Sequence, residues 1–523
     1  MFAENRQTKL LTLFAMCFAL FMAMLDNTVV NVALPKIQES LQAGVSGLQW
    51  VVDAYTLLFA SLLLTGGTLG DLFGRKRLFM TGLLVFSLGS LLCGLAGSIG
   101  ALIASRALQG VGAAALIPST LSIITHTFPD PRERAQAIGL WAGVSGLALA
   151  LGPVVGGLLV DSLGWQSVFF LNVPVGIAGL IVASRYAPES KNPEGRTIDL
   201  PGQFLGIAWL GSLTYALIEG NARGWTSTLI LSCLAIAVVG LVIFLLVERR
   251  SSSPMLQLTF FRNSTFTAGV TVAALVSFGM FGMLFFLSLF MQNVQGYSPV
   301  GAGLRFLPAT VAIIITAPLA GRLAGRIGSR LPMTVGMALV GAGMLLYLGV
   351  HEGTPYLHWF WIQPIQGIGM GLTMAPMTAA VMSSVPPARS GMASATTNAS
   401  REVGGTFGIA LLGAILTARF NSVMGGLLAA QGIPAVARSR IEFALSHGGA
   451  ASASGSLPRG IDRAALRSAF GHAFVDGMHL AMMVAAAALL AGAVVAFLFV
   501  EPRVGERHEP GGQVPPVPEP VPA

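Results

Sequence analysis

The stretch Gly67–Leu78 reads G-T-L-G-D-L-F-G-R-K-R-L and lies between two long apolar segments. Starting 254 positions later, Gly321–Leu331 repeats it in altered form as G-R-L-A-G-R-I-G-S-R-L. Arg106–Gly112 (R-A-L-Q-G-V-G) and Gln363–Gly369 (Q-P-I-Q-G-I-G) form a second pair at a similar offset. A glycine- and arginine-rich turn between apolar helices, present once per half, indicates a duplicated membrane transporter built as two helical bundles.

The composition supports a membrane protein. The chain has 523 residues, of which 54% are hydrophobic and 10% charged, with a mean hydropathy of +0.75. Soluble proteins carry about 25% charged residues. The net charge of +8 is spread over short loops, which is typical of membrane topology and argues against a nucleic-acid partner. Cys17, Cys93 and Cys233 lie in separate apolar runs, and we expect no metal site and no cofactor.

We expect fourteen membrane spans, because a bilayer core requires about 20 apolar residues per helix. An even number of spans places both termini on one side. Most Lys and Arg residues lie in loops on that side, whereas the short opposite loops contain only Lys36, Arg223 and Arg305. This bias predicts that both termini are cytoplasmic, in a bacterial cytoplasmic (inner) membrane. The spans are expected to begin near Leu10, Trp50, Leu78, Gly100, Gln136, Val168, Leu200, Thr226, Phe266, Val300, Pro332, His358, Ala393 and Met478.

The repeat predicts the domain organisation. It aligns spans 1–6 with spans 9–14, which leaves spans 7 and 8 as an insertion between the bundles. We expect an N-terminal six-helix bundle at 1–190, two inserted helices at 191–250 and a C-terminal six-helix bundle at 251–500. That second bundle contains an external loop at 421–477. The Pro-rich tail at 501–523 is expected to be disordered and cytoplasmic.

These features resemble a known family, the major facilitator superfamily, in its fourteen-spanner drug:proton antiporter (EmrB/QacA-like) branch. The loop after span 2 is similar to the superfamily signature, and Arg106–Gly112 is similar to its span 4 motif. Gly152–Gly157 (G-P-V-V-G-G) resembles the span 5 motif of antiporters. Leu25–Pro35 (L-D-N-T-V-V-N-V-A-L-P) resembles the span 1 signature of the branch, and Trp165 with Asn172-Val173-Pro174 fits it too. The resemblance implies the major facilitator fold and proton-coupled export.

Ionisable groups in the membrane core are expensive and are functional candidates. Asp26, Asp53 and Arg106 fall at similar depth in the first bundle, so we expect them to form part of a proton-coupling or substrate site. Burial opposes ionisation of Asp26 whereas a neighbouring Arg106 favours it. Each residue also has an alternative interpretation. Asp26 could form a hydrogen bond that only fixes helix packing, and Asp53 could lie in interfacial water beside Trp50. Arg106 could be a structural partner for a carboxylate or a backbone carbonyl group.

Arg401 and Glu402 interrupt span 13 near its middle. Neighbours in a helix point about 100° apart, so they are not expected to neutralise one another. Three interpretations of Arg401 and Glu402 remain open: a contact to a cationic substrate, a second proton site, or a buried structural pair. In the second half Gln363 replaces Arg106 and Gly325 replaces Asp71, which favours the N-terminal bundle as the coupling half.

Two motifs are expected to act in gating and packing. In the loop after span 2, the Asp71 carboxylate can accept hydrogen bonds from the N-terminus of a helix across the bundle interface. The basic residues keep the loop on the cytoplasmic side. The alternative is that the motif only anchors the loop on that side and has no part in gating. In span 5 the glycines permit close packing against the other bundle and the proline favours a bend. The gating-loop residues are Gly67, Asp71, Gly74, Arg75, Lys76 and Arg77, and the span 5 residues are Gly152, Pro153, Gly156 and Gly157.

The sequence thus predicts a proton-driven exporter of lipophilic, cationic drugs that works by alternating access, with the lipid bilayer, a small-molecule substrate and protons as partners. Phe and Met residues crowded between Phe278 and Met377 suit bulky lipophilic cations, although each fits ordinary packing as well. An exporter of a self-made metabolite or antibiotic is the alternative within the fold. A transport-dead sensor or membrane enzyme is the alternative of another class; the sequence shows no catalytic cluster. It identifies no periplasmic adaptor.

Overall fold

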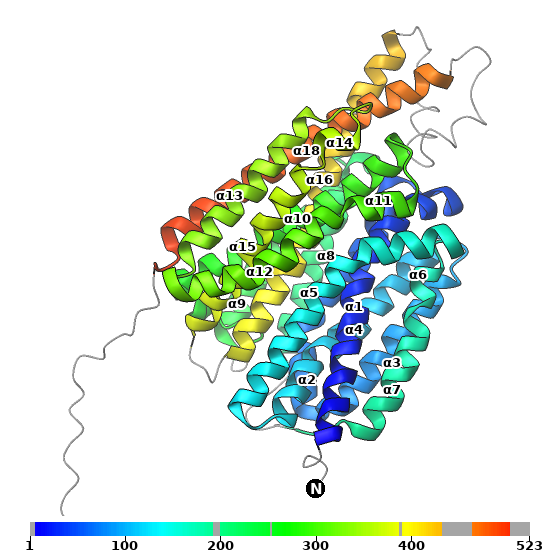
Figure 1. Cartoon of the computed structure of the whole chain (residues 1–523). Helices are drawn as coiled ribbons and strands as arrows, with labels where there is room; N and C mark the ends of the chain where they lie inside the picture. Colours follow the sequence, from blue (N-terminus) through cyan, green and yellow to red (C-terminus); the bar gives the residue numbers. More distant parts are fainter. Residues whose placement is uncertain (1–5, 192–198, 252–253, 386–389, 431–462, 503–523) are drawn as a thin grey trace, which may run out of the picture.

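The computed structural model describes residues 6–191, 199–251, 254–385, 390–430 and 463–502. Apolar segments that must satisfy their backbone groups internally become helices in a membrane, and the described part of the chain contains helices and no strands (Figure 1). The first half consists of α1 (Arg6–Leu41), α2 (Val45–Phe73), α3 (Arg75–Gly94), α4 (Ile99–Thr127), α5 (Pro131–Leu163), α6 (Ser167–Phe170) and α7 (Asn172–Tyr186).

Two helices follow the first half and lead into the second. The inserted pair is α8 (Leu200–Arg223) and α9 (Thr228–Arg250). The second half consists of η1 (Leu258–Arg262), α10 (Ser264–Leu289), η2 (Phe290–Val294), α11 (Pro299–Arg305), α12 (Leu307–Ile327), α13 (Arg330–Leu346), η3 (Tyr347–Gly349), α14 (Tyr356–Trp359), α15 (Ile362–Ser383), α16 (Ser390–Ala430) and α18 (Arg463–Phe499).

The number of spans agrees in part with the expectation. Within the described ranges, 12 helical segments are long and apolar enough to cross a membrane. The other two expected spans are helices as well, α5 with 33 residues and α8 with 24. At 1.5 Å per residue these are about 50 and 36 Å long, so both are long enough to cross a bilayer. The second part of α5, Leu151–Leu163, is apolar. The count of fourteen spans stays a prediction.

The internal repeat is confirmed by matched close contacts between helices. A Cβ added to Gly82 of α3 would lie 2.9 Å from the carbonyl oxygen of Gly112 on α4. The equivalent Gly336 of α13 would meet Gly369 on α15, at 2.6 Å. Glycine at both positions of each half allows the two backbones to touch. The duplicated phrases in the sequence therefore build the same helix pair twice.

The expected external loop is partly helical, which corrects its predicted boundaries. α16 continues to Ala430 and α18 begins at Arg463, so residues 421–430 and 463–477 extend the two helices. The extensions pack together through Phe420 and Phe470, whose ring centroids are 5.5 Å apart. Apolar residues that pair in this way extend both helices into the segment that the sequence predicts as an external loop with a mixed helical stretch. The Gly/Ser/Ala segment and the tail beyond Pro502 lie outside the described residues.

The two halves are joined at one end of the molecule and separate at the other. We call the end where α1 begins the proximal end and the end where α1 finishes the distal end. Distally, one buried hydrophobic cluster includes Val30 of α1 and Phe286 of α10. Proximally, each half has its own buried cluster, one containing Leu20 and the other Phe266. Figure 1 shows the halves converging distally and diverging toward the end with the N-terminus.

Hydrogen bonds between the halves reinforce the distal junction. Ser288 of α10 donates to the carbonyl oxygen of Asn31 at 2.8 Å, and Asn293 of η2 donates to the Gln38 side chain at 3.0 Å. Both acceptors lie in the last third of α1. Polar side chains paired across buried helices hold them in a fixed register. The described structure is therefore a distally closed state of a two-bundle molecule.

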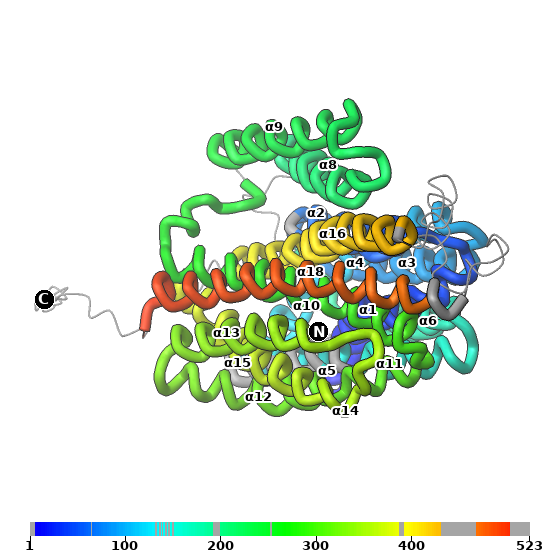
Figure 2. The backbone as a smooth tube through the Cα atoms, turned by 90° about the horizontal axis from the view of Figure 1, so that it is seen from above, coloured from blue at the N-terminus to red at the C-terminus, as the bar shows by residue number. Residues whose placement is uncertain are grey.

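Helix α8 lies against both halves, with α9 on its outer side (Figure 2). Gln203 of α8 donates to the backbone of Ser61 on α2 at 2.9 Å, and Trp50 of α2 donates to Glu219 at 3.1 Å. Asn221 of α8 donates to the carbonyl oxygen of Ala414 on α16 at 2.6 Å. The inserted helix therefore bonds to α2 along its length and bridges to the second half at the distal end.

Candidate coupling site

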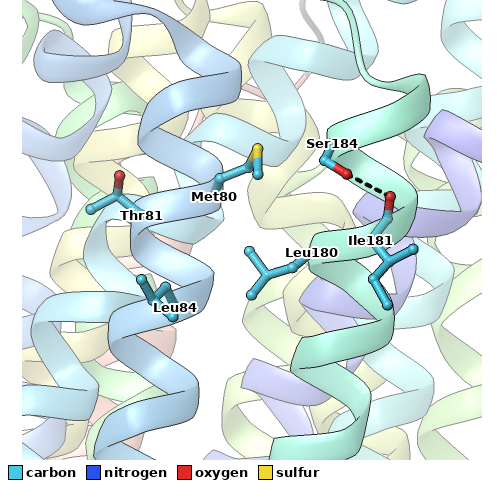
Figure 3. A pocket seen from close by; sticks show the side chains of 6 residues that line it. All are labelled: Met80, Thr81, Leu84, Leu180, Ile181 and Ser184. Carbon is cyan, nitrogen blue, oxygen red and sulfur yellow. Dashed lines mark hydrogen bonds between the residues drawn. The ribbon is translucent and has the colours of Figure 1, made fainter.

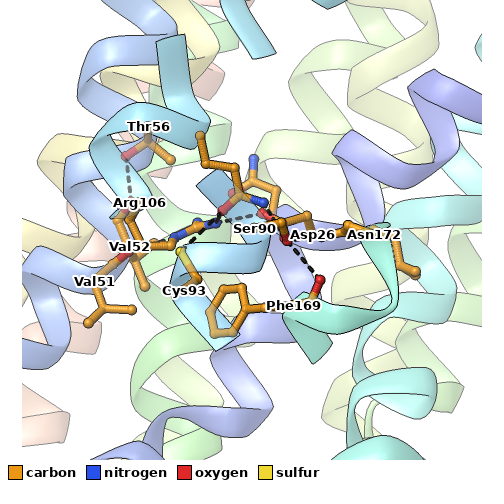
Figure 4. Close-up of polar contacts among 12 residues, drawn as sticks. Asp26, Val51, Val52, Thr56, Ser90, Cys93, Arg106, Phe169 and Asn172 are labelled. Carbon is orange, nitrogen blue, oxygen red and sulfur yellow. Dashed lines mark hydrogen bonds and ion pairs between the residues drawn. The ribbon is translucent and has the colours of Figure 1, made fainter. Parts of the chain in front are cut away.

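Asp26 is the centre of a buried polar network in the first half (Figure 4). It lies 20 residues along α1, about 30 Å from Arg6. One carboxylate oxygen accepts from the Arg106 guanidinium at 2.6 Å, and the other accepts from Gln109 at 2.9 Å and from Asn172 at 2.7 Å. Asp26 and Arg106 are both 0% exposed. Three donors from two other helices thus converge on a group that only accepts when ionised.

The partners of Asp26 are held in turn by further contacts. Arg106 donates to the carbonyl oxygen of Val51 at 3.0 Å and to Gln109 at 2.7 Å. Asn172 also donates to Ser90, whose hydroxyl donates to the carbonyl oxygen of Phe169. Such a connected network fixes the side chains of α1, α2, α3, α4 and α7 relative to one another. The predicted neighbourhood of Asp26 and Arg106 is therefore present, as a closed ion pair.

Tyr55 connects this network to the interface between the halves. The Arg106 guanidinium carbon lies 4.3 Å from the centroid of the Tyr55 ring, a distance that allows a cation–π contact. Tyr55 is also close enough to interact electrostatically with both Asp26 and Glu402. Its hydroxyl has no hydrogen-bond partner among the described residues. The tyrosine therefore stands between the ion pair of the first half and an acidic group of the second.

Asp53 lies on the face of α2 that packs against α16. On this face Gln49 donates to the carbonyl oxygen of Ile409 at 2.8 Å, and the hydroxyls of Thr56 and Thr406 are 3.0 Å apart. Asp53 falls between Gln49 and Thr56 at helical spacing. It is 0% exposed, and among the described residues its carboxyl group has no polar contact closer than the neighbouring side chain of Thr56. Asp53 is thus separate from the Asp26 network, and it is not in interfacial water, as the alternative expectation had it.

Glu402 lies half-buried where α16 meets α1. Its carboxyl group accepts a hydrogen bond from Asn27, the residue next to Asp26. Its second oxygen is buried without a partner. Because adjacent helix positions diverge by about 100°, Asp26 points into the first half while Asn27 reaches the second. Arg401 and Glu402 interact electrostatically, but no ion pair joins them among the described residues.

The gating loop binds to its own half in this state. Asp71 accepts from Arg75 at 2.8 Å, four residues further on. The Lys76 ammonium donates to the carbonyl oxygen of Ser184 at 2.7 Å, and Arg77 lies 3.8 Å from Glu189. Gly74 has φ +115°, a backbone conformation that favours glycine. These contacts attach the α2–α3 turn to the end of α7.

The glycine motif of α5 divides its contacts between the two halves. Gly156 packs on Val29 of α1, and a Cβ there would lie 2.7 Å from the valine side chain. A Cβ on Gly157 would lie 2.6 Å from the carbonyl oxygen of Pro299 on α11, in the second half. Gly303 of α11 packs equally closely on the backbone of Pro153. The motif therefore forms part of the distal contact between the halves.

The Phe and Met cluster belongs to the packed interior in this state. Phe281 and Phe286 are 4% and 1% exposed and belong to the shared distal cluster. Phe281 packs against Gly405 of α16, within the second half. For most of these residues the ordinary packing interpretation fits the structure.

Sequence reasoning missed several members of the site. Tyr55 and Ser90 gave no signal, because each stands alone in an apolar run. Gln109 and Asn172 belong to sequence motifs, but the motifs do not indicate that these two side chains bind a buried carboxylate. Asn27 directly follows Asp26, and its importance depends on which way its side chain points. For Gln109, Asn172 and Asn27 the available signal is a strongly polar side chain inside an apolar span, but it does not identify the partner.

Comparisons with known proteins agree with this architecture. The sequence model of the Major Facilitator Superfamily matches residues 16–409. Multidrug resistance protein Stp of Mycobacterium tuberculosis is 42% identical over 418 residues, which are 80% of this chain and 78% of Stp. The tetracenomycin C resistance and export protein of Streptomyces glaucescens is 35% identical over 502 residues, which are 95% of this chain and 92% of that protein.

Solved structures share the fold. A bacterial homologue of the human lysosomal transporter Spinster, in an inward-facing and occupied conformation, aligns with a TM-score of 0.66. The alignment covers 97% of this chain and 100% of the homologue at 19% sequence identity. At this identity the likeness concerns the arrangement of the helices alone.

Proposed function

Because the chain belongs to the major facilitator superfamily, in its drug-exporter branch, we propose that it exports lipophilic, cationic compounds in exchange for protons. We place both termini in the cytoplasm of a bacterium, so that the proximal end faces inward and the described state is inward-facing. Two acids at the interface of the halves, Asp53 and Glu402, support this proposal most strongly, because both have a buried carboxyl oxygen that lacks a well-formed hydrogen bond within the described part of the chain.

We assign proton carriage to Asp53 and Glu402. A carboxyl group with few polar partners and little water around it is easier to bury in its neutral form, whereas contact with water favours the ionised form. Asp53 is covered by α16 in the distally closed state. It would reach external water when the halves separate there, and could then exchange its proton. Movement of the bundles would thus connect the same group to water on only one side at a time.

The two threonines between these acids suit a proton path. Thr56 lies three residues after Asp53, and Thr406 lies four residues after Glu402. Their hydroxyls are 3.0 Å apart across the interface. Hydroxyl groups both donate and accept, so this pair is placed to pass a proton from the distal acid toward the central one. Loading of Glu402 would then weaken its attraction for a cationic substrate and favour release.

Asp26 and Arg106 have a different part in this proposal. The carboxylate of Asp26 accepts three hydrogen bonds, including that of the ion pair, and such charge-assisted bonds hold the helices that donate them in place. We assign the pair to fixing α1 relative to α4 and α7, so that Asn27 is presented to Glu402. This assignment departs from the expectation that Asp26 itself carries the proton. Measurements of efflux by variants of Asp53, Glu402 and Asp26 distinguish the two assignments.

The experiment is dye efflux from proteoliposomes with an imposed pH gradient. We expect Asp53→Asn and Glu402→Gln to abolish gradient-driven efflux, with Asp161→Asn as an exposed control. Asp26→Asn should lose protein stability as well as efflux. Efflux by Asp53→Asn and Glu402→Gln at the wild-type rate would overturn the assignment of the carriers.

A dedicated exporter of an antibiotic is the second candidate. The relative from Streptomyces glaucescens is described as a resistance and export protein for tetracenomycin C, and it aligns over nearly its whole length. If wild-type protein transports no lipophilic cation under a pH gradient, but transports one antibiotic of an uncharged class, this second candidate replaces the first.

A further inference from the structure

A groove lies between α3 and α7 on the outer surface of the first half. Figure 3 shows the side chains that line it, three from each helix. Its volume is about 420 Å³, within the range of about 300–1,000 Å³ typical of sites that bind small molecules. It does not belong to the coupling site, which lies inside the bundle. The lining residues are Met80, Thr81, Leu84, Leu180, Ile181 and Ser184.

The groove continues as an apolar track on the membrane-facing surface. Leu84 and Leu88 of α3 are 48% and 47% exposed, and Ile177 and Ile181 of α7 are 53% and 60% exposed. Within each helix these residues are four positions apart, so they lie along one face. The track runs from the proximal end toward the middle of the molecule. Its length and apolar character suit a hydrocarbon chain.

Basic residues stand at the proximal end of this track. Arg77 of α3 lies four residues before Thr81, and its side chain is 73% exposed with Glu189 at 3.8 Å. Arg185 lies in the last turn of α7, next to Ser184, and is exposed. Among the described residues Arg185 forms no hydrogen bond or ion pair. Two guanidinium groups with unused donors therefore stand where the apolar track meets the polar surface.

We propose that the groove binds an anionic phospholipid of the cytoplasmic leaflet, with an acyl chain between α3 and α7 and its phosphate at Arg77 and Arg185. Guanidinium groups bind phosphate oxygens through charge-assisted hydrogen bonds, and basic pockets between membrane helices bind anionic head groups. The choice of leaflet rests on the proposed orientation of the transporter. The lipid would tie the gating loop to α7 at the rim where Lys76 already bonds to Ser184.

Lipid titration of the full-length protein tests the proposal. Delipidated protein in detergent is titrated with phosphatidylglycerol or with phosphatidylcholine of the same acyl chains, and bound lipid is counted by native mass spectrometry. Wild-type protein should prefer phosphatidylglycerol. Arg185→Gln should weaken phosphatidylglycerol binding about fivefold and leave phosphatidylcholine unchanged. Leu84→Trp, which fills the groove, should weaken binding of both lipids.

Arg249→Gln is the matched control, because Arg249 is an exposed arginine near the proximal end of α9, away from the groove. It should bind phosphatidylglycerol as the wild type does. Equal affinity of wild-type protein for the two lipids would overturn the proposal, and so would equal effects of Arg185→Gln and Arg249→Gln. If Arg185→Gln does not fold, unchanged binding by Leu84→Trp overturns it. The assay needs neither substrate nor pH gradient, so it is independent of the proposed transport activity.

Discussion

The buried ion pair offers a quantitative test of how the first half is held together. Replacement of Asp26 by asparagine keeps the size of the side chain but turns one acceptor oxygen into a donor. That donor would face Arg106, Gln109 or Asn172, all of which donate to Asp26. Removal of one partner from a buried pair costs about 3–5 kcal/mol, because the other charge stays buried without compensation. We expect a destabilisation of this size for Asp26→Asn and for Arg106→Gln.

A double-mutant cycle isolates the interaction between the two groups. If the single changes acted independently, the double variant would lose about 6–10 kcal/mol. We expect the double variant to lose no more than the worse single variant, which gives a coupling energy of about 3 kcal/mol or more. The measurement is equilibrium unfolding of purified protein in detergent with increasing denaturant.

An exposed ion pair of the same length provides the control. Arg419 and Asp476 are also 2.6 Å apart, but their side chains are 47% and 35% exposed. Exposed pairs contribute about 0–1 kcal/mol, so the cycle of Arg419→Gln with Asp476→Asn should give a small coupling energy. Additive losses at Asp26 and Arg106, or equal coupling in the two cycles, would refute the reasoning that burial makes the difference.

Three further predictions concern packing and conformational change. Gly157→Val should push α5 away from Pro299 of α11 and lower transport; unchanged efflux with full expression would contradict a close contact there. Asn221→Ala removes the hydrogen bond between α8 and α16, which contributes about 1 kcal/mol. Spin-label distance measurements should therefore show about a fivefold larger population of the distally open state. An unchanged distance distribution would argue against a bridge between these helices. Gly74→Ala should cost about 1–3 kcal/mol in unfolding experiments because of its backbone conformation, and Gly67→Ala, with open space around it, is its control.

Much of the fold is predictable from the sequence because the relevant signals are local. Apolar segments of membrane-spanning length identify the helices, and the repeated glycine phrases identify the duplication. Helices that continue past the membrane were harder to predict, because the extension of α16 to Ala430 depends on packing against α18. The inserted pair was recognised as an insertion. The sequence did not predict that this pair bridges the two halves, because the contact of Asn221 with Ala414 joins residues 193 positions apart.

The candidate site was predictable as a set of residues and not as a set of contacts. Asp26, Asp53, Arg106 and Glu402 stand out because charge is rare in apolar spans. Their depth along the helices predicts that Asp26, Asp53 and Arg106 lie at the same level. Depth does not indicate in which direction around its helix axis each side chain points. Asp53 turns toward α16, whereas Asp26 turns into its own half. Tyr55, which lies near both groups, carries no charge and therefore gave no signal.

The order of residues alone indicates that the chain is a duplicated helical membrane protein, and it shows which ionisable groups lie within the predicted spans. Those conclusions rest on hydrophobicity and on the spacing of residues along one chain. The pairing of Asp26 with Arg106, and the position of Asp53 and Glu402 at the interface between the halves, become visible only in the packed structure. This is because the partner of a buried side chain depends on how the helices rotate and pack against one another. That arrangement is fixed by close contacts between distant residues such as Gly157 and Pro299.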